Sequence, residues 1–141
     1  MSLATDDWKD AAQAARKVEA DPNGLSLNTP GAKADAGKTR HALMTSGFAR
    51  ALNAVAEVTT YGAEKYSPNG WMHVVNGKER YADAMARHLN AADRGQLTDK
   101  DSGLLHLAHS AWNCLALLEL FLREQEKHAQ NPVPLDLPVV S

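Results

Sequence analysis

The chain has 141 residues, of which 44% are hydrophobic and 23% charged, as is typical of one globular domain with a modest core. Its net charge of −2, with histidine neutral, argues against tight binding to nucleic acid, which usually requires a basic excess. A single cysteine excludes an intrachain disulfide, and no apolar run approaches the roughly 18 residues of a membrane span, so we expect a cytoplasmic protein.

Residues 1–36 are rich in alanine, aspartate and lysine and are expected to form an N-terminal arm. A short helix is predicted from Asp6 to Ala20, and the turn residues Asp21-Pro22-Asn23-Gly24 end it. Residues 25–36 are predicted to be a loop. This arm could pack on another subunit.

Two helices are predicted in the middle of the chain. The first runs from about Gly47 to Lys65, with Thr45 or Ser46 as its N-cap. The second runs from about Glu79 to Arg94 and ends at Gly95, the residue type that most often follows a helix.

A longer helix is predicted from about Leu104 to His128, with Asp101 or Ser102 as its cap, and residues 131–141 are expected to form an extended tail. The helix is apolar around more than half of its circumference, and no alternation typical of strands is present. We therefore predict an all-α domain over residues 37–130, a small bundle of three to four helices. Such a bundle has a thin core, so we expect a homodimer or higher homo-oligomer to complete it.

Three polar residues share one stripe of this last helix. His106, His109 and Asn113 recur at intervals of three and four residues, which places them within roughly 60° of one another. Burying two imidazoles and an amide among apolar residues costs free energy unless a metal, a phosphate, a base edge or a partner side chain satisfies them. Two interpretations stay open: a metal or ligand site, or histidines that hydrogen-bond within a helix interface.

Three further titratable residues are candidates for the same site. His88 lies on the apolar face of the preceding helix, and antiparallel packing across the 95–102 loop would bring it to His106, although a lone histidine there is more often a core residue. Glu57 interrupts an apolar stretch, and a buried carboxylate needs a cation or strong donors. Asp101 lies about one turn before His106, either as a helix cap or as a carboxylate beside the histidines.

The segment Gly37-Lys38-Thr39-Arg40 places two cations around a small flexible stretch, which suits phosphate binding. It lacks the glycine spacing of a Walker loop. The His-Glu-x-x-His motif, the nucleophile elbow and the Glu-x-x-His repeats of di-iron bundles are also absent from the sequence.

Seven short motifs follow one another in a familiar order. They are Gly37-Lys38-x-Arg40, Glu57-Val58-x-x-Tyr61-Gly62-Ala63-x-Lys65-Tyr66, Trp71, Tyr81-x-x-Ala84-x-x-Arg87-His88-Leu89, Asp101-Ser102-Gly103, His106-Leu107-x-His109 and Trp112-Asn113. Over Gly37 to about Glu119, this order resembles the N-terminal domain of phage dATP/dGTP diphosphohydrolases, a group similar to the all-α, MazG-like nucleoside triphosphate pyrophosphohydrolases.

The resemblance implies a phage source, a nucleotide ligand and a divalent metal. The expected reaction is hydrolysis of a (deoxy)purine triphosphate to monophosphate and pyrophosphate. The sequence departs from MazG-like enzymes because their Glu-x-x-Glu and Glu-x-x-Asp pairs are missing. Histidines stand where carboxylates are expected, so a transition metal is an alternative to Mg²⁺ or Mn²⁺.

The residues and the resemblance together give a set of expected roles. The expected catalytic residues are Glu57, Asp101 and His88. The expected metal ligands are Glu57, Asp101, His106 and His109. The residues expected to bind nucleotide or phosphate are Lys38, Arg40, Tyr61, Lys65, Trp71, Arg87 and Asn113. Two alternatives remain, a phage protein that binds and sequesters a signalling nucleotide without cutting it, and a purely structural helical domain.

Overall fold

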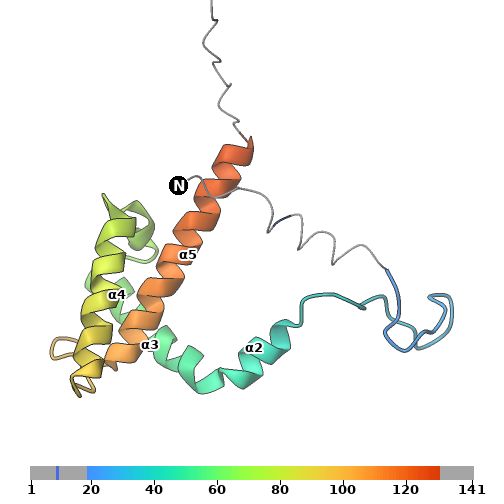
Figure 1. Ribbon diagram of the computed structural model, residues 1–141, viewed down its shortest axis with the longest axis horizontal. Coiled ribbons are helices and arrows are strands. Elements are labelled where there is room, and N and C mark those ends of the chain that lie inside the picture. The colour runs from blue at the N-terminus through green and yellow to red at the C-terminus, as the bar shows by residue number, and fades with distance from the viewer. Residues whose placement is uncertain (1–8, 10–18, 131–141) are drawn as a thin grey trace, which may run out of the picture. The chain divides into compact units, whose positions relative to one another are not determined.

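A computed structural model describes residue 9 and residues 19–130 of the chain. Within these residues the protein is all-α, as predicted, and contains no strand (Figure 1). The helices are α2 (His41–Gly47), α3 (Ala49–Lys65), the 3₁₀ helix η1 (Gly70–His73), α4 (Gly77–Asp93) and α5 (His106–Gln130). Almost all of the predicted helix at residues 6–20, and the tail at 131–141, lie outside the described residues. None of the helices described is long and apolar enough to cross a membrane.

The chain divides into two compact units, residues 1–47 and residues 48–141, and each is described by itself. Besides residue 9, the described part of the first unit is a non-helical segment over residues 19–40, which includes the loop predicted at 25–36, followed by α2. All residues of α2 are exposed. A backbone hydrogen bond from Ala36 N to Ala20 O, 3.0 Å long, closes this loop at its base.

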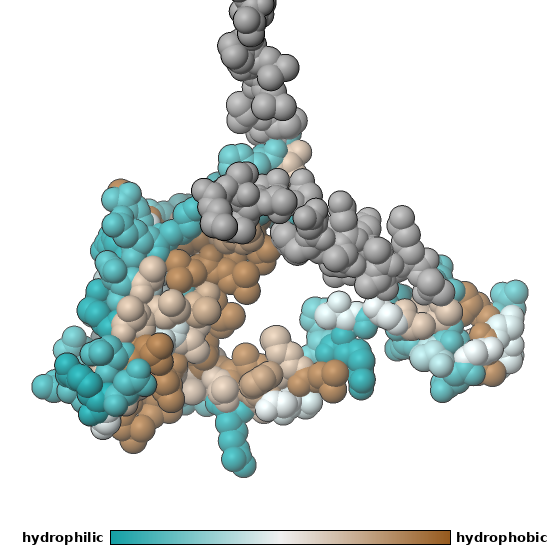
Figure 2. All heavy atoms as spheres, viewed as in Figure 1, coloured by the Kyte–Doolittle hydropathy of each residue, from teal (hydrophilic) through white to brown (hydrophobic). Residues whose placement is uncertain are grey.

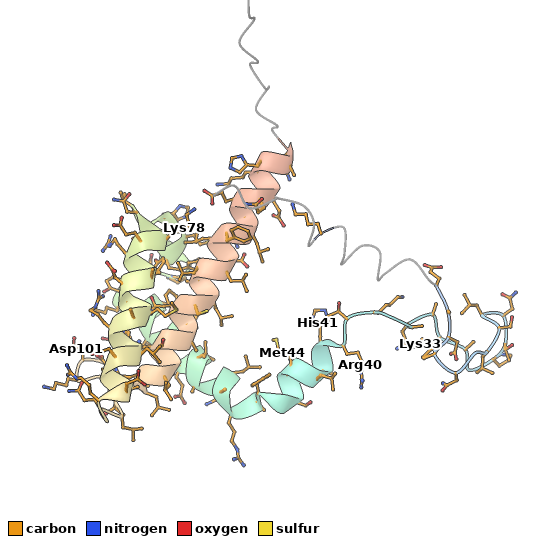
Figure 3. The ribbon with its side chains drawn as sticks, in the orientation of Figure 1. Lys33, Arg40, His41, Met44, Lys78 and Asp101 are labelled. Carbon is orange, nitrogen blue, oxygen red and sulfur yellow. The ribbon has the colours of Figure 1, made fainter. Side chains whose placement is uncertain are left out.

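Asp21 organises the loop of the first unit from within. It is only 7% exposed, and its two carboxylate oxygens accept the backbone N–H groups of Asn23 and Lys33, each at 2.8 Å (Lys33 is labelled in Figure 3). The bond from Lys33, followed by that from Asn23, holds the pKa of this carboxyl below its usual value. Both oxygens of Asp21 are therefore committed to the backbone.

The start of the second predicted helix differs from the expectation. Thr45 and Ser46 lie inside the separate helix α2, where their hydroxyls donate to the carbonyl of Ala42 at 3.3 and 2.6 Å. Phe48 occupies the N-cap position of α3, and no side chain caps that helix. The predicted cap was wrong because serine and threonine can also bond back to a carbonyl of the preceding turn within a helix.

In the second unit, α4 and α5 pack side by side, and α3 packs on α5 (Figure 1). The predicted C-terminal glycine of α4 is confirmed, since Gly95 has a φ of +83° and its N–H bonds to Ala92 O at 2.9 Å. Residues 94–105 connect α4 to α5. Because α5 begins at His106, Asp101 and Ser102 belong to this loop and do not cap the helix, contrary to the expectation.

The core of the second unit contains few fully buried apolar residues. They are Val58 on α3 and Ala108 and Ala116 on α5, each 4–6% exposed. Apolar side chains stay exposed elsewhere on α5, and Figure 2 shows brown, apolar surface on this unit. Polar contacts also join the helix pair, such as the hydrogen bond that the buried Ser110 hydroxyl donates to Met85 O at 3.1 Å.

Candidate functional site

The loop between α4 and α5 is built around the carboxylate of Asp99. One oxygen, Oδ2, accepts the backbone N–H groups of Asp101 and Ser102 at 3.2 and 3.0 Å and the Ser102 hydroxyl at 3.1 Å. Burial alone would raise the pKa of Asp99, but the bonds from Ser102, together with the nearby rings of His109 and His88, hold that pKa below its usual value. The loop is closed at its base by the bond from Asp99 N to Leu104 O, 2.8 Å long.

Three histidines meet where this loop enters α5. The Nδ1 atoms of His88 and His106 are 2.9 Å apart, so the predicted approach of these two rings is confirmed. The ring of His88 also stacks on that of His109, with centroids 4.5 Å apart and an interplanar angle of 11°. His88 therefore contacts both of the other rings.

A directed chain of hydrogen bonds links the histidines to Asp99. The Ser102 hydroxyl lies 2.7 Å from Nε2 of His109 and donates its one proton to Asp99. Nε2 of His109 must then carry a proton and donate it to Ser102 Oγ. The order of donation is thus from His109 to Ser102 to Asp99.

Burial favours the neutral form of the His88 and His109 rings. It lowers the pKa of His88, and the neighbouring His109 lowers it further because two imidazolium ions would repel each other. Burial likewise lowers the pKa of His109, despite the opposing attraction of Asp99. Neutral imidazoles keep a nitrogen lone pair that can bind a ligand or a metal.

The predicted burial of the polar stripe on α5 is confirmed. His106, His109 and Asn113 are 8%, 8% and 5% exposed, and the Asn113 amide donates to the carbonyl of His109 at 2.8 Å. Each residue of the stripe has a protein partner, as the interface interpretation requires. His109 and Asn113 also line a cavity, as the ligand interpretation requires.

This cavity has a volume of about 820 Å³ and lies between residues of α3, η1, α4, α5 and the 94–105 loop. One wall is aromatic: Trp112 makes edge contacts with Trp71 and Tyr81, at centroid distances of 5.8 and 5.6 Å. The Tyr81 hydroxyl donates to the carbonyl of Trp71 at 2.7 Å, which fixes η1 to α4. The volume lies within the range of ligand pockets.

Charged residues of both signs line the rest of the cavity. The cations are Lys65, Arg80 and Arg87, and the carboxylates are Asp83, Asp99 and Asp101. Figure 3 shows Asp101 at the loop end of the α4–α5 pair, far from Lys78 at the other end. The Lys65 ammonium lies 5.6 Å from the ring centroid of Tyr61, so α3 contributes a cation beside an aromatic face.

Most of the residues singled out from the sequence meet at this cavity. Those that line it are Tyr61, Lys65, Trp71, Arg87, His88, Asp101, His109 and Asn113. His106 lies against His88 without lining the cavity. Glu57 is exposed, accepts a hydrogen bond from Asn53 Nδ2 at 3.1 Å and does not line the cavity. Lys38 and Arg40 belong to the first unit.

The expected site residues did not include Asp83, Trp112, Arg80 or Asp99, all of which line the cavity. Nothing in the sequence distinguishes Arg80 from other charged residues on a helix surface, and only the surrounding elements show that it lines a cavity. Asp99 had a recognisable signal, because an aspartate followed three residues later by serine in a polar loop is typical of a side chain that organises a turn.

Comparison with known protein families identifies the family to which the chain belongs. The sequence matches, over residues 28–130, the family described as dATP/dGTP diphosphohydrolase, N-terminal. The chain belongs to this family. The match confirms the resemblance found from the seven motifs and extends it toward both ends. Searches of curated proteins and of solved structures found no match.

Proposed function

We propose that the protein is a metal-dependent nucleotide phosphohydrolase that cleaves a purine deoxynucleoside triphosphate to the monophosphate and pyrophosphate. The family description supports the reaction and the choice of dATP or dGTP. The observation that carries the proposal is the cavity, which combines an aromatic wall, three cations and a group of carboxylates and imidazoles. We propose that it acts in the cytoplasm of a cell infected by a phage.

The cavity offers separate places for base and phosphates. Trp71 and Trp112 give apolar aromatic surface on which a purine can stack. Arg80 and Arg87 are seven residues apart on α4, which puts them on one face two turns apart, and Lys65 adds a third cation from α3. Charge-assisted hydrogen bonds from these cations would hold the triphosphate.

Hydrolysis requires a bond from a water oxygen to the α-phosphorus, while the bond from that phosphorus to its bridging oxygen breaks. Pyrophosphate leaves with the electron pair. Asp101, which faces the cavity, would accept the proton of the water, and His88 would help to orient the phosphates. The expected roles of Glu57, His106 and His109 as metal ligands remain predictions.

A divalent metal, when bound, would neutralise phosphate charge and lower the pKa of a bound water. The donors that line the cavity are imidazoles as well as carboxylates. This mixed set of nitrogen and oxygen donors suits Mn²⁺ or another first-row transition ion. Mg²⁺ prefers a site made of oxygen ligands alone.

A second candidate function is nucleotide binding without hydrolysis. It is favoured by a specific observation: the carboxylate pairs typical of MazG-like enzymes are missing, and Asp99 and His109 are already bonded to Ser102. The family description also names an N-terminal domain, so another part of such proteins could carry the chemistry.

Incubation of the protein with each of the four dNTPs, in Mg²⁺ or Mn²⁺, followed by product chromatography, tests the proposal. We expect pyrophosphate and dAMP or dGMP, with faster turnover of purines. Arg87→Gln should raise KM by at least about tenfold, whereas Arg94→Gln, outside the cavity, should not. A nucleotide-induced rise in Tm without turnover would favour the binding protein, and neither response would favour the structural domain.

The exposed leucines on α5 support a further proposal, that two copies of the chain associate. Leu107, Leu115 and Leu118 are 61%, 50% and 53% exposed, and their spacing places them on one face of the helix. A second copy covering this face would add the apolar core that three helices lack. Light scattering should show a dimer, dissociated by Leu118→Glu and retained in the control Leu97→Glu; a monomeric wild type would contradict the proposal.

A further inference from the structure

One ligand atom from each of His88, Asp99 and His106 lies within 4.8 Å of the other two. We infer that these three residues form a binding site for a first-row transition ion such as Zn²⁺ or Co²⁺, and that the site prefers such an ion to Mg²⁺. This ligand set differs from the one expected from the sequence, since it contains Asp99 and His88 in place of Glu57, Asp101 and His109. The inference deepens the proposed function. It rests on that function only in expecting that the ion contacts a nucleotide in the cavity.

The two imidazole nitrogens are already spaced for chelation. Two nitrogens that bind one ion at about 2.1 Å, at angles between those of octahedral and tetrahedral sites, are about 3.0–3.4 Å apart. The Nδ1 atoms of His88 and His106 are 2.9 Å apart, so an ion fits between them after a small separation of the rings. Without the ion, the Nδ1–H of one ring donates a hydrogen bond to Nδ1 of the other. With the ion bound by both Nδ1 atoms, each neutral ring would carry its proton on Nε2, so binding would release no proton.

The third ligand is a carboxylate with a free oxygen. The three hydrogen bonds that Asp99 accepts from the loop all go to Oδ2. None of the hydrogen bonds within the described part of the chain goes to Oδ1. The loop therefore fixes the orientation of the carboxylate through one oxygen and leaves the other for a cation, as outer-shell hydrogen bonds do at metal sites.

The surroundings would hold the ligands and leave the ion open on one side. His106 is buried, at 8% exposed, and the stacked ring of His109 limits rotation of His88. His88 and Asp99 line the cavity, whereas His106 does not. Three protein ligands with an open side toward a ligand cavity is the arrangement of catalytic rather than structural metal sites.

The donor types decide the class of ion. Imidazole binds Zn²⁺, Co²⁺ and Ni²⁺ well, whereas Mg²⁺ favours oxygen ligands and gives up its water reluctantly. Two nitrogens and one oxygen therefore select against Mg²⁺, even though Mg²⁺ could still accompany the nucleotide phosphates.

The test is metal binding by the EDTA-treated full chain in the absence of nucleotide. Calorimetry should give one Zn²⁺ or Co²⁺ per chain, with a Kd at least about tenfold below that of Mg²⁺, and Co²⁺ should develop a visible absorption band. Asp99→Asn and His106→Gln should each weaken binding by at least about tenfold. The matched controls are Asp93→Asn and His73→Ala, which change exposed residues outside the cluster. Both control variants should bind the ion as the wild type does.

Circular dichroism melts of the metal-free variants separate lost ligands from lost folding. Asn at position 99 keeps an oxygen that can accept the loop amides, so Asp99→Asn decides the matter even if His106→Gln does not fold. The inference is overturned if no stoichiometric ion binds, if Mg²⁺ binds as tightly, if the ligand variants bind normally, or if the controls lose binding equally.

The nucleotide assays are independent of this result. Turnover with Mg²⁺ by a chain that binds neither Zn²⁺ nor Co²⁺ would remove the transition-ion site and keep the hydrolase. Stoichiometric ion binding that depends on Asp99 and His106, without turnover of any nucleotide, would keep the site and contradict the hydrolase.

Discussion

The loop at residues 20–36 of the first unit and the loop at residues 94–105 of the second are built in the same way. A backbone hydrogen bond closes each loop at its base, and one aspartate accepts N–H groups from within each loop. Asp21 gives both oxygens to the backbone, whereas Asp99 gives only Oδ2 and faces histidines and a cavity with the rest of its carboxylate. The same local chemistry thus makes a structural anchor in one place and a candidate functional group in the other.

The largest difference between the two aspartates should appear in activity. Asp99→Ala removes a charge from the cavity and the acceptor that orders its loop, so kcat for dATP or dGTP should fall by at least about 100-fold. Asp21→Ala should leave kcat within about twofold, because Asp21 contacts only its own loop. Steady-state kinetics at saturating nucleotide measure both, and equal losses would remove the distinction between the loops.

His109→Ala should lose both stability and nucleotide response. The ring bonds to Ser102 and stacks on His88, so the free energy of unfolding should fall by about 1–3 kcal/mol. The ring also lines the cavity, so the rise in Tm on adding nucleotide and Mn²⁺ should largely disappear. His128→Ala, at the exposed end of α5, is the control.

Thermal and urea melts, each with and without nucleotide, separate these two roles. A His109→Ala protein that is less stable but keeps its full nucleotide response would assign the ring to the helix interface alone.

A serine in each loop offers a smaller and more local comparison. The Ser102 hydroxyl bonds to Asp99, His109 and the N–H of Leu104, so Ser102→Ala should lower the free energy of unfolding by about 1–2 kcal/mol. In the other loop, Ser26 contributes its carbonyl to a turn, and Ser26→Ala should change stability by less than about 0.5 kcal/mol. Urea unfolding monitored by tryptophan fluorescence measures both, and a neutral Ser102→Ala would show that the hydrogen-bond chain adds no stability.

The smallest effect is the acid titration of the first loop. Because the folded pKa of Asp21 lies below the usual aspartate value of 3.8, its bonds stabilise the loop above that pH and are lost as pH falls through the folded pKa. Amide NMR shifts of Asn23 and Lys33 should titrate together with a midpoint below 3.8. A midpoint at or above that value would show that these bonds do not form.

Patterns that depend on periodicity were predicted well from the sequence. The helix around His106 and His109, the burial of both rings and the approach of His106 to His88 follow from residue spacing and one short connection. Gly95 was recognisable because a helix end needs a left-handed residue.

Features that depend on a loop's internal hydrogen bonds were not predicted. Asp101 and Asp99 are two residues apart in a polar segment, and composition alone does not tell which one turns inward. Glu57 looked buried because apolar residues flank it in the sequence, but Val58 faces the core and the neighbouring carboxylate is exposed. The face that a residue presents depends on which partner helix covers it.

The polar interior of the second unit has a consequence for how it responds to temperature. Unfolding would expose imidazole, amide and hydroxyl groups along with few fully buried apolar side chains, and polar exposure lowers the heat capacity whereas apolar exposure raises it. The heat-capacity change per residue should therefore be smaller than in an ordinary helical domain. The stability of the site would then vary only slowly with temperature, along a shallow curve.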